Sequence, residues 1–308
     1  MYLGFLTACL PHVSLPEKAK WAADKGFKAL EVACWPRLND RDYASSDIDV
    51  AHLTQQEANE IREMMDHFGL VISSLAYYDN NLDADREKRA FVNNHTRQCI
   101  RAAQLLGVPA VGTFVGRNIK KTIADNFDEF EIVFKEIVEE AESLGVQIII
   151  ENCPMEGWQV PLQPGTISFT PELWEEMFRR IPNPNFGLNF DPSHLFYQLI
   201  DPLPLISSFK DRIFHVHAKD AELFPDKLKY FGIYNKLLPT TPGTGYWRFR
   251  MPGLGQVDFA GMIRELKKIG YHGVISIEHE DPLYEESTEK IYEGLGLGLK
   301  HMEALLSL

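Results

Sequence analysis

Residues 145–151, GVQIIIE, combine a helix-ending residue with a buried strand. Gly145 is the kind of residue that ends helices, because glycine readily adopts the left-handed conformation needed there. The isoleucines that follow are typical of a parallel strand that is covered on both faces. The stretch therefore predicts a helix-to-strand junction, and the strand ends in a carboxylate, Glu151.

The same unit recurs along the chain. Gly26, Gly69, Gly107 and Gly270 each precede another short apolar segment, and amphipathic segments with helix-start signals separate them. Strands are expected at residues 3–8, 29–34, 71–76, 110–114, 148–151, 187–191, 213–218 and 273–278. This repetition favours an α/β fold, a single (β/α)8 TIM barrel formed by residues 1–308. An open doubly wound sheet is the alternative, but it normally carries a Gly-rich turn after its first strand, and TACLPHVSLPEK has none.

One interval departs from the repeat. About residues 220–257, between the seventh and eighth strands, form a long insertion rich in glycine, proline and aromatic residues. Long connections of this kind are commonly functional or disordered, and the aromatic content argues against disorder. We expect an ordered loop over the mouth of the barrel.

Composition excludes several classes of protein. With 31 Lys+Arg against 44 Asp+Glu, the net charge is -13, which disfavours nucleic-acid binding. No apolar run approaches the roughly 18 residues of a membrane span. The four cysteines have no CxxC spacing, so reduced thiols in a cytoplasmic protein are the simplest interpretation.

Four consecutive predicted strands finish with side chains that can bind metal. They end in IIIE, LNFD, HVH and ISIE, which give Glu151, Asp191, His217 and Glu278. In a (β/α)8 barrel, the C-terminal strand ends meet at one mouth, where the chemistry takes place. Any one of these residues alone is more typical of a helix cap or a salt bridge, but four in register predict one shared site.

Buried carboxylates need a compensating charge, which a divalent cation would supply. Three carboxylates and one imidazole suit Mn2+, Mg2+ or Co2+, of which Mn2+ is expected first, and suit Zn2+ less well because the set has no thiolate. His194, one short turn after Asp191, is placed near the metal or the substrate. His215 should be a hydrogen-bonded histidine one layer deeper than His217, and His279 should point away from the bore.

This set resembles the xylose-isomerase-like TIM-barrel superfamily, in particular the sugar isomerase and epimerase branch that includes ketose 3-epimerases. The residues that carry the resemblance are Glu151, Asp191-x-x-His194, His217 and Glu278. It implies a metal-dependent enzyme of carbohydrate metabolism that transfers a proton through an enediolate. Glu151 and Glu278 would be the catalytic acid/base pair, and His194 and Glu156 would contact sugar hydroxyls. A homo-oligomer or a companion subunit is a weaker expectation.

The sequence departs from the epimerase pattern after the seventh strand, where an arginine is expected. HAKDAELFP has Lys219 and Asp220 instead. Lys219 is either a substrate contact, a solvated lysine or a partner of Asp220, and Arg250 or Arg248 in the insertion could replace the missing arginine. Trp35 and Trp158 could stack on a sugar or serve in packing. The acidic EHEDPLYEE after the eighth strand disfavours a phosphorylated substrate.

Three other functions compete with a sugar isomerase or epimerase. A lyase or deglycosidase acting on 3-keto-glycosides could use the same metal and acid/base pair. An abasic-site endonuclease would need further histidines near the third and fourth strand ends, where LAYYDNN and GTFVGRN have none. A non-catalytic sugar-binding module would not need two metal-bound glutamates.

Overall fold

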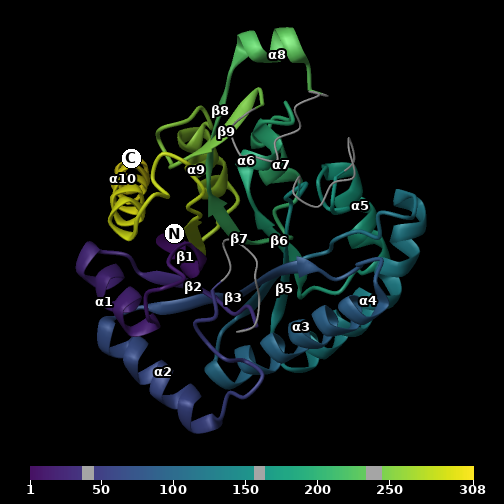
Figure 1. The fold of residues 1–308 in the computed structure, drawn as a ribbon, viewed down its shortest axis with the longest axis vertical. Helices are drawn as coiled ribbons and strands as arrows, with labels where there is room; N and C mark the ends of the chain where they lie inside the picture. Colours follow the sequence, from purple (N-terminus) through teal and green to yellow (C-terminus); the bar gives the residue numbers. More distant parts are fainter. Residues whose placement is uncertain (37–44, 156–163, 234–244) are drawn as a thin grey trace.

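The barrel is closed by eight parallel strands (Figure 1). The computed structural model describes residues 1–36, 45–155, 164–233 and 245–308. The barrel strands are β1 (Tyr2–Leu6), β2 (Ala29–Ala33), β3 (Val71–Asn80), β4 (Ala110–Phe114), β5 (Gln147–Glu151), β6 (Phe186–Phe190), β7 (Ile213–Ala218) and β10 (Val274–Ile277). Each strand pairs with the next in this order, and β1 also pairs with β10, which closes the ring. The predicted fold class is confirmed.

Helices surround this ring and cover the outer faces of the strands (Figure 1). The longer ones are α1 (Leu15–Lys25), α2 (Gln55–Phe68), α3 (Arg86–Leu106), α4 (Ile123–Ser143), α5 (Pro171–Arg180), α9 (Phe259–Lys268) and α10 (Thr288–Leu306). Shorter ones are the 3-10 helix η1 (Thr7–Cys9), α6 (Pro192–Phe196), α7 (Leu203–Ser208) and α8 (Pro225–Phe231). None of the described helices is long and apolar enough to cross a bilayer.

Local sequence signals fix the ends of several helices. Thr54 and Glu57 form a reciprocal capping box at the start of α2, in which each side chain accepts a hydrogen bond from the other residue's amide. Gly145, just after α4, has a φ of 70°, which glycine adopts without strain. Because the chain turns tightly there, β5 enters the barrel at once and carries Glu151 to the mouth.

The first strand ends at Leu6 and not at residue 8, since Thr7–Cys9 form a 3-10 helix. The structure also differs from the predicted elements in two larger features. First, β3 continues to Asn80 instead of ending at residue 76, since its last residue pairs with Phe114 of β4. Second, the insertion contains an antiparallel ribbon, formed by β8 (Asp220–Leu223) and β9 (Trp247–Arg250). In Figure 1, this ribbon and α8 project beyond the barrel. Residues 234–244 lie outside the described part of the chain, so for them the predicted cover stays a prediction.

The four cysteines are free and buried, which confirms the expectation of unpaired thiols. Isoleucine, leucine and phenylalanine side chains of the strands and the inner faces of the helices form one continuous apolar core. Burial of this apolar area stabilises the barrel. Glu151, Asp191, His217 and Glu278 are among its buried polar residues.

Candidate metal centre

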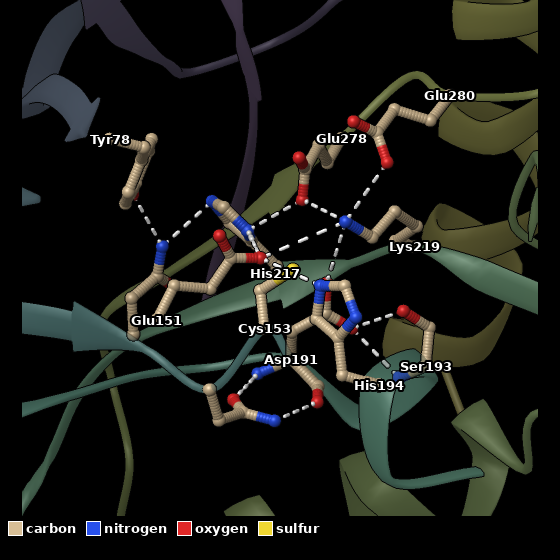
Figure 2. Close-up of polar contacts among 12 residues, drawn as sticks. Tyr78, Glu151, Cys153, Asp191, Ser193, His194, His217, Lys219, Glu278 and Glu280 are labelled. Atoms are coloured by element: carbon tan, nitrogen blue, oxygen red, sulfur yellow. Dashed lines mark hydrogen bonds and ion pairs between the residues drawn. The ribbon is translucent and has the colours of Figure 1, made fainter. Parts of the chain in front are cut away.

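Glu151, Asp191, His217 and Glu278 converge at the C-terminal end of the barrel strands (Figure 2). Each residue contributes one possible ligand atom, and these four atoms all lie within 4.8 Å of one another. All four side chains are buried. The structure therefore brings together the whole set of residues that the sequence proposed as metal ligands.

Strand register explains this convergence. Glu151 of β5 lies beside Asn189 of β6, and Asp191 follows Asn189 by two residues on the same side of the chain. In the same way, His217 of β7 lies beside Ser276 of β10, two residues before Glu278. Because side chains alternate with a period of two, the ligands of each pair of strands point into the same space.

Asp191 is held in place by hydrogen bonds with Asn152 and Ser193. The Asn152 side chain donates to the Asp191 carbonyl and accepts from its amide, both at 2.8 Å. Asp191 Oδ1 caps α6, where it accepts hydrogen bonds from the Ser193 amide at 2.7 Å and hydroxyl at 2.6 Å. These contacts use one carboxylate oxygen and leave Oδ2 directed at the site.

The donor set fits a divalent cation. Asp191 Oδ2 and Glu278 Oε2 are buried. Within the described part of the chain they have ion-pair contacts, such as those with Lys219, but no hydrogen bond of regular geometry. Three carboxylates this close together repel one another, and a bound cation would offset that repulsion. Carboxylate oxygens with one imidazole suit Mn2+, Mg2+, Co2+ or Zn2+.

Lys219 places a positive charge at this cluster. Its ammonium lies 2.9 Å from Glu278 Oε2, 3.3 Å from Glu280 Oε2 and 3.4 Å from Asp191 Oδ2. Two of the interpretations considered for Lys219 are wrong. It is 1% exposed and not solvated, and Asp220 is instead surrounded by backbone amides.

The charged groups of the cluster shift one another's pKa values. Burial alone would raise the pKa of Glu151, but Lys219, His194 and His217 outweigh it and hold this pKa well below its usual range. Burial likewise disfavours the charged form of His217. Attraction by Glu31 and Glu278 prevails there and raises the pKa of His217 well above its ordinary value.

His194 reaches the ligand shell, as predicted from its position one turn after Asp191. Its Nε2 lies 3.2 Å from Glu151 Oε1 and 3.5 Å from Asp191 Oδ2. The ring of Phe249, from β9, meets the His194 ring edge-on at 5.5 Å, and it also lies 4.6 Å from the Lys219 ammonium. One residue of the insertion thus packs against two residues of the site.

Arg250 does not join the site. Its guanidinium is paired with Glu222 and Asp281, each at 2.9 Å. Along β9, side chains alternate, so Phe249 faces the site while Arg248 and Arg250 face the other way. Two carboxylates distant in sequence thus hold the Arg250 side chain, and the predicted substrate contact by Arg250 stays a prediction.

The remaining predicted substrate contacts have different outcomes. Trp35 is buried and packs near Tyr77 and Tyr78, with ring centroids 6.1 and 6.2 Å away, which is a packing role. A sugar contact by Trp35 stays a prediction. Glu156 and Trp158 lie outside the described residues.

Sequence reasoning missed the layer beneath the ligands. Glu31 of β2 is buried and accepts a hydrogen bond from Tyr78 at 2.5 Å, and its other oxygen lies 2.8 Å from His217 Nε2. A carboxylate within an apolar strand was the available signal, but Glu31 stands mid-strand and not at a strand end. His215 is a hydrogen-bonded buried histidine, as predicted, with contacts to Asn189 at 2.9 Å and Ser73 at 3.1 Å.

Comparison with known proteins agrees with the barrel fold. A family described as the xylose isomerase-like TIM barrel matches residues 19–299. The chain belongs to this family. One sequence relative of the chain is the protein YfiH of Bacillus subtilis (strain 168), which is 24% identical over 91% of this chain and 93% of that protein. The inosose dehydratase of Lacticaseibacillus casei is 26% identical over 64% of this chain and 65% of that enzyme.

Solved structures share the fold. The IolI protein with a bound zinc atom has a TM-score of 0.74 at 20% identity, covering 100% of this chain and 98% of that chain. D-psicose 3-epimerase from Clostridium cellulolyticum H10, solved with D-tagatose, has a TM-score of 0.71 at 14% identity, covering 99% of each chain. A D-tagatose 3-epimerase-like protein has a TM-score of 0.68 at 21% identity, covering 100% of this chain and 99% of that chain.

Proposed function

We propose that the protein is a divalent-metal-dependent enzyme that isomerises or epimerises a non-phosphorylated sugar or sugar derivative. The observation that carries this proposal is the convergence of Glu151, Asp191, His217 and Glu278 within 4.8 Å. Relatives and structural neighbours named as epimerases and inosose dehydratases support a sugar or cyclitol substrate. Mn2+ is the favoured ion, and Mg2+, Co2+ and Zn2+ remain to be compared with it.

Two glutamates are suited to move the proton. Glu151 and Glu278 come from β5 and from the end of β10, with β6 and β7 between these strands in the barrel. Each carboxylate has two oxygens, so one can hold an ion while the other takes or returns a substrate proton. A bound divalent cation would stabilise the negative charge that develops on the substrate oxygens. Two bases on opposite sides of one carbon account for inversion at that carbon.

Other residues would orient the substrate. The His194 ring and the Lys219 ammonium both lie against the ligand carboxylates and can donate to sugar oxygens. Glu280, 3.3 Å from Lys219, adds a further acidic group at the same place. This concentration of carboxylates would repel a phosphate dianion, which favours an uncharged sugar, a cyclitol or a glycoside.

The test is exchange of carbon-bound hydrogen with solvent. The enzyme, loaded in turn with each ion, is incubated in deuterium oxide with ketoses and inososes, and label in the sugar is measured by mass spectrometry. We expect Glu151→Gln and Glu278→Gln to lower exchange by at least about 100-fold, as removal of an acid/base group does. Glu140→Gln, which alters a surface ion pair with Arg97, is the matched control and should exchange normally. Normal exchange by either site variant would refute the assigned role.

A second candidate is elimination, as in a dehydratase or a lyase acting on 3-keto-glycosides. It is favoured by Lys219, whose ammonium beside Glu278 could donate a proton to a departing oxygen, and by the inosose dehydratases among the relatives. Release of water or of an aglycone from inososes or 3-keto-glucosides would identify elimination. Stereochemical inversion without release would identify the epimerase.

A further inference from the structure

A closed hydrogen-bonded layer lies directly beneath the four proposed ligands. Glu31, from β2 on the far side of the barrel, is fully buried, and its Oε2 lies 2.8 Å from His217 Nε2. Its Oε1 accepts the hydrogen of the Tyr78 hydroxyl at 2.5 Å. A buried carboxylate is costly unless it is paired and hydrogen-bonded, so these two contacts account for its presence.

The contact with Glu31 decides which nitrogen of His217 faces the site. Nδ1 is the atom that lies 2.8 Å from Glu278 Oε2 and 3.3 Å from Glu151 Oε1. An ionised carboxylate can only accept, so Nε2 must carry the hydrogen that is shared with Glu31. In a neutral imidazole, the lone pair then resides on Nδ1, where the other proposed ligands gather.

Asn189 completes the layer. Its Nδ2 lies 2.8 Å from His217 Nε2 but also donates to the Tyr78 hydroxyl at 2.7 Å. Its Oδ1 accepts from His215 Nδ1 at 2.9 Å. One of the two Nδ2 hydrogens and the Oδ1 atom of Asn189 thus have partners of their own. The Nε2 hydrogen of His217 needs an acceptor, and the Glu31 carboxylate is the charged acceptor within reach, which makes the stronger hydrogen bond.

The same atoms could be taken for a second metal site, because Glu31, His215 and His217 also lie within 4.8 Å of one another. Their contacts argue against it. His215 uses one nitrogen for Asn189 and the other for Ser73, and Glu31 uses its oxygens for Tyr78 and His217. A metal there would have to break four protein hydrogen bonds. In the upper cluster, Asp191 Oδ2 and Glu278 Oε2 have ion-pair contacts with described residues but no hydrogen bond of regular geometry.

We propose that Glu31, fixed by Tyr78, is a positioning residue that sets the tautomer and orientation of His217 for a single metal ion. This proposal rests on the metal site proposed above. Carboxylates that accept the second N–H of a ligating histidine orient the ring and increase its basicity, and their loss commonly weakens metal binding. Room for Tyr78 is provided by β4, because a Cβ at Gly112 would collide with the Tyr78 hydroxyl.

The experiment measures metal affinity and stoichiometry by titration calorimetry with Mn2+ and Co2+, on the chelator-treated full-length protein. We expect one ion per chain. Glu31→Gln should bind roughly 10- to 100-fold more weakly, and Tyr78→Phe about fivefold more weakly, the effect of one lost hydrogen bond. The visible absorption of bound Co2+ should change in Glu31→Gln, since a neutral amide can turn either its oxygen or its NH2 group to His217 Nε2 and so no longer fixes one tautomer.

The matched control is Asp47→Asn, which makes the same chemical change at a buried carboxylate paired with Lys18 at 2.6 Å. It should lower thermal stability and leave metal affinity unchanged. Unchanged affinity and an unchanged Co2+ spectrum in Glu31→Gln would overturn the positioning role while the metal site stood. A second ion that disappears in Glu31→Gln would equally overturn it. A wild-type chain that binds no divalent ion would refute the proposed function itself.

Discussion

His279 stands next to a proposed metal ligand but faces the opposite way. It is buried, and neither ring nitrogen has a hydrogen-bond partner among the described residues. Burial lowers its pKa to about 4, so the ring is neutral at pH 7. Gly294 of α10 allows this approach, because a Cβ there would lie 2.8 Å from His279 Nε2. Because side chains alternate along a strand, Glu278 points to the site while the adjacent His279 packs against α10.

This position yields a stability prediction. Replacing a buried polar group that lacks a partner by an apolar group of similar shape removes a desolvation cost. We expect His279→Leu to raise the free energy of unfolding by about 1 kcal/mol, as measured by urea unfolding of the chelator-treated protein. Gly294→Ala is the companion variant, and it should destabilise through the collision with the ring. A marked loss of stability in His279→Leu would mean that the imidazole has a polar role.

At the scale of elements, the β8–β9 ribbon determines how the insertion meets the barrel. Asp220 accepts four backbone hydrogen bonds, from Ala221, Gly253, Gly255 and Val257, at 2.8 to 3.0 Å. Two amides lie on each carboxylate oxygen. This one side chain ties the start of the insertion to its end, and so holds Phe249 against the site.

Asp220→Asn should loosen that closure. Whichever way the amide is turned, its NH2 group faces two backbone donors, so two buried N–H groups lose their acceptor. We expect a loss of about 2–4 kcal/mol in the free energy of unfolding and faster hydrogen exchange at residues 247–257, as measured by mass spectrometry. Asp226→Asn, on exposed α8, should change neither quantity. Equal exchange rates in Asp220→Asn and the wild type would show that other contacts hold the ribbon.

At the scale of the whole molecule, an acidic chain concentrates carboxylates in one buried place. The net charge is -13, and Glu151, Asp191 and Glu278 lie together beside the ammonium of Lys219. Folding must bring these charges together without water to screen them. A cation that binds the folded chain but not the unfolded chain should therefore stabilise the whole barrel.

The measurement is thermal unfolding with and without added ions. At a free ion concentration about 100 times Kd, binding adds about 2.7 kcal/mol, which for a domain of this size raises Tm by roughly 5 °C. Chelator should reverse the rise. Asp191→Asn should respond much less than the wild type at equal ion concentration. A wild-type Tm that is the same with ion and with chelator would contradict the proposed site.

The sequence by itself predicted the barrel and the convergence of the four proposed ligands. Repeated glycine-to-strand junctions predict the alternation of elements, and the strand period with barrel topology brings Glu151, Asp191, His217 and Glu278 to one mouth. These inferences need only the order of strands and the side that each residue faces. The extension of β3 was missed because pairing with β4, not local propensity, carries it to Asn80.

Only the tertiary structure decided which side chains pair across the bore. Glu31 and His217 are 186 residues apart and meet because the ring of strands closes. The direction taken by Lys219 and the diversion of Arg250 likewise depend on carboxylates from other elements. Periodicity specifies a face, but it contains no information on the partner opposite. That information arises when closure of the barrel fixes distances between strands.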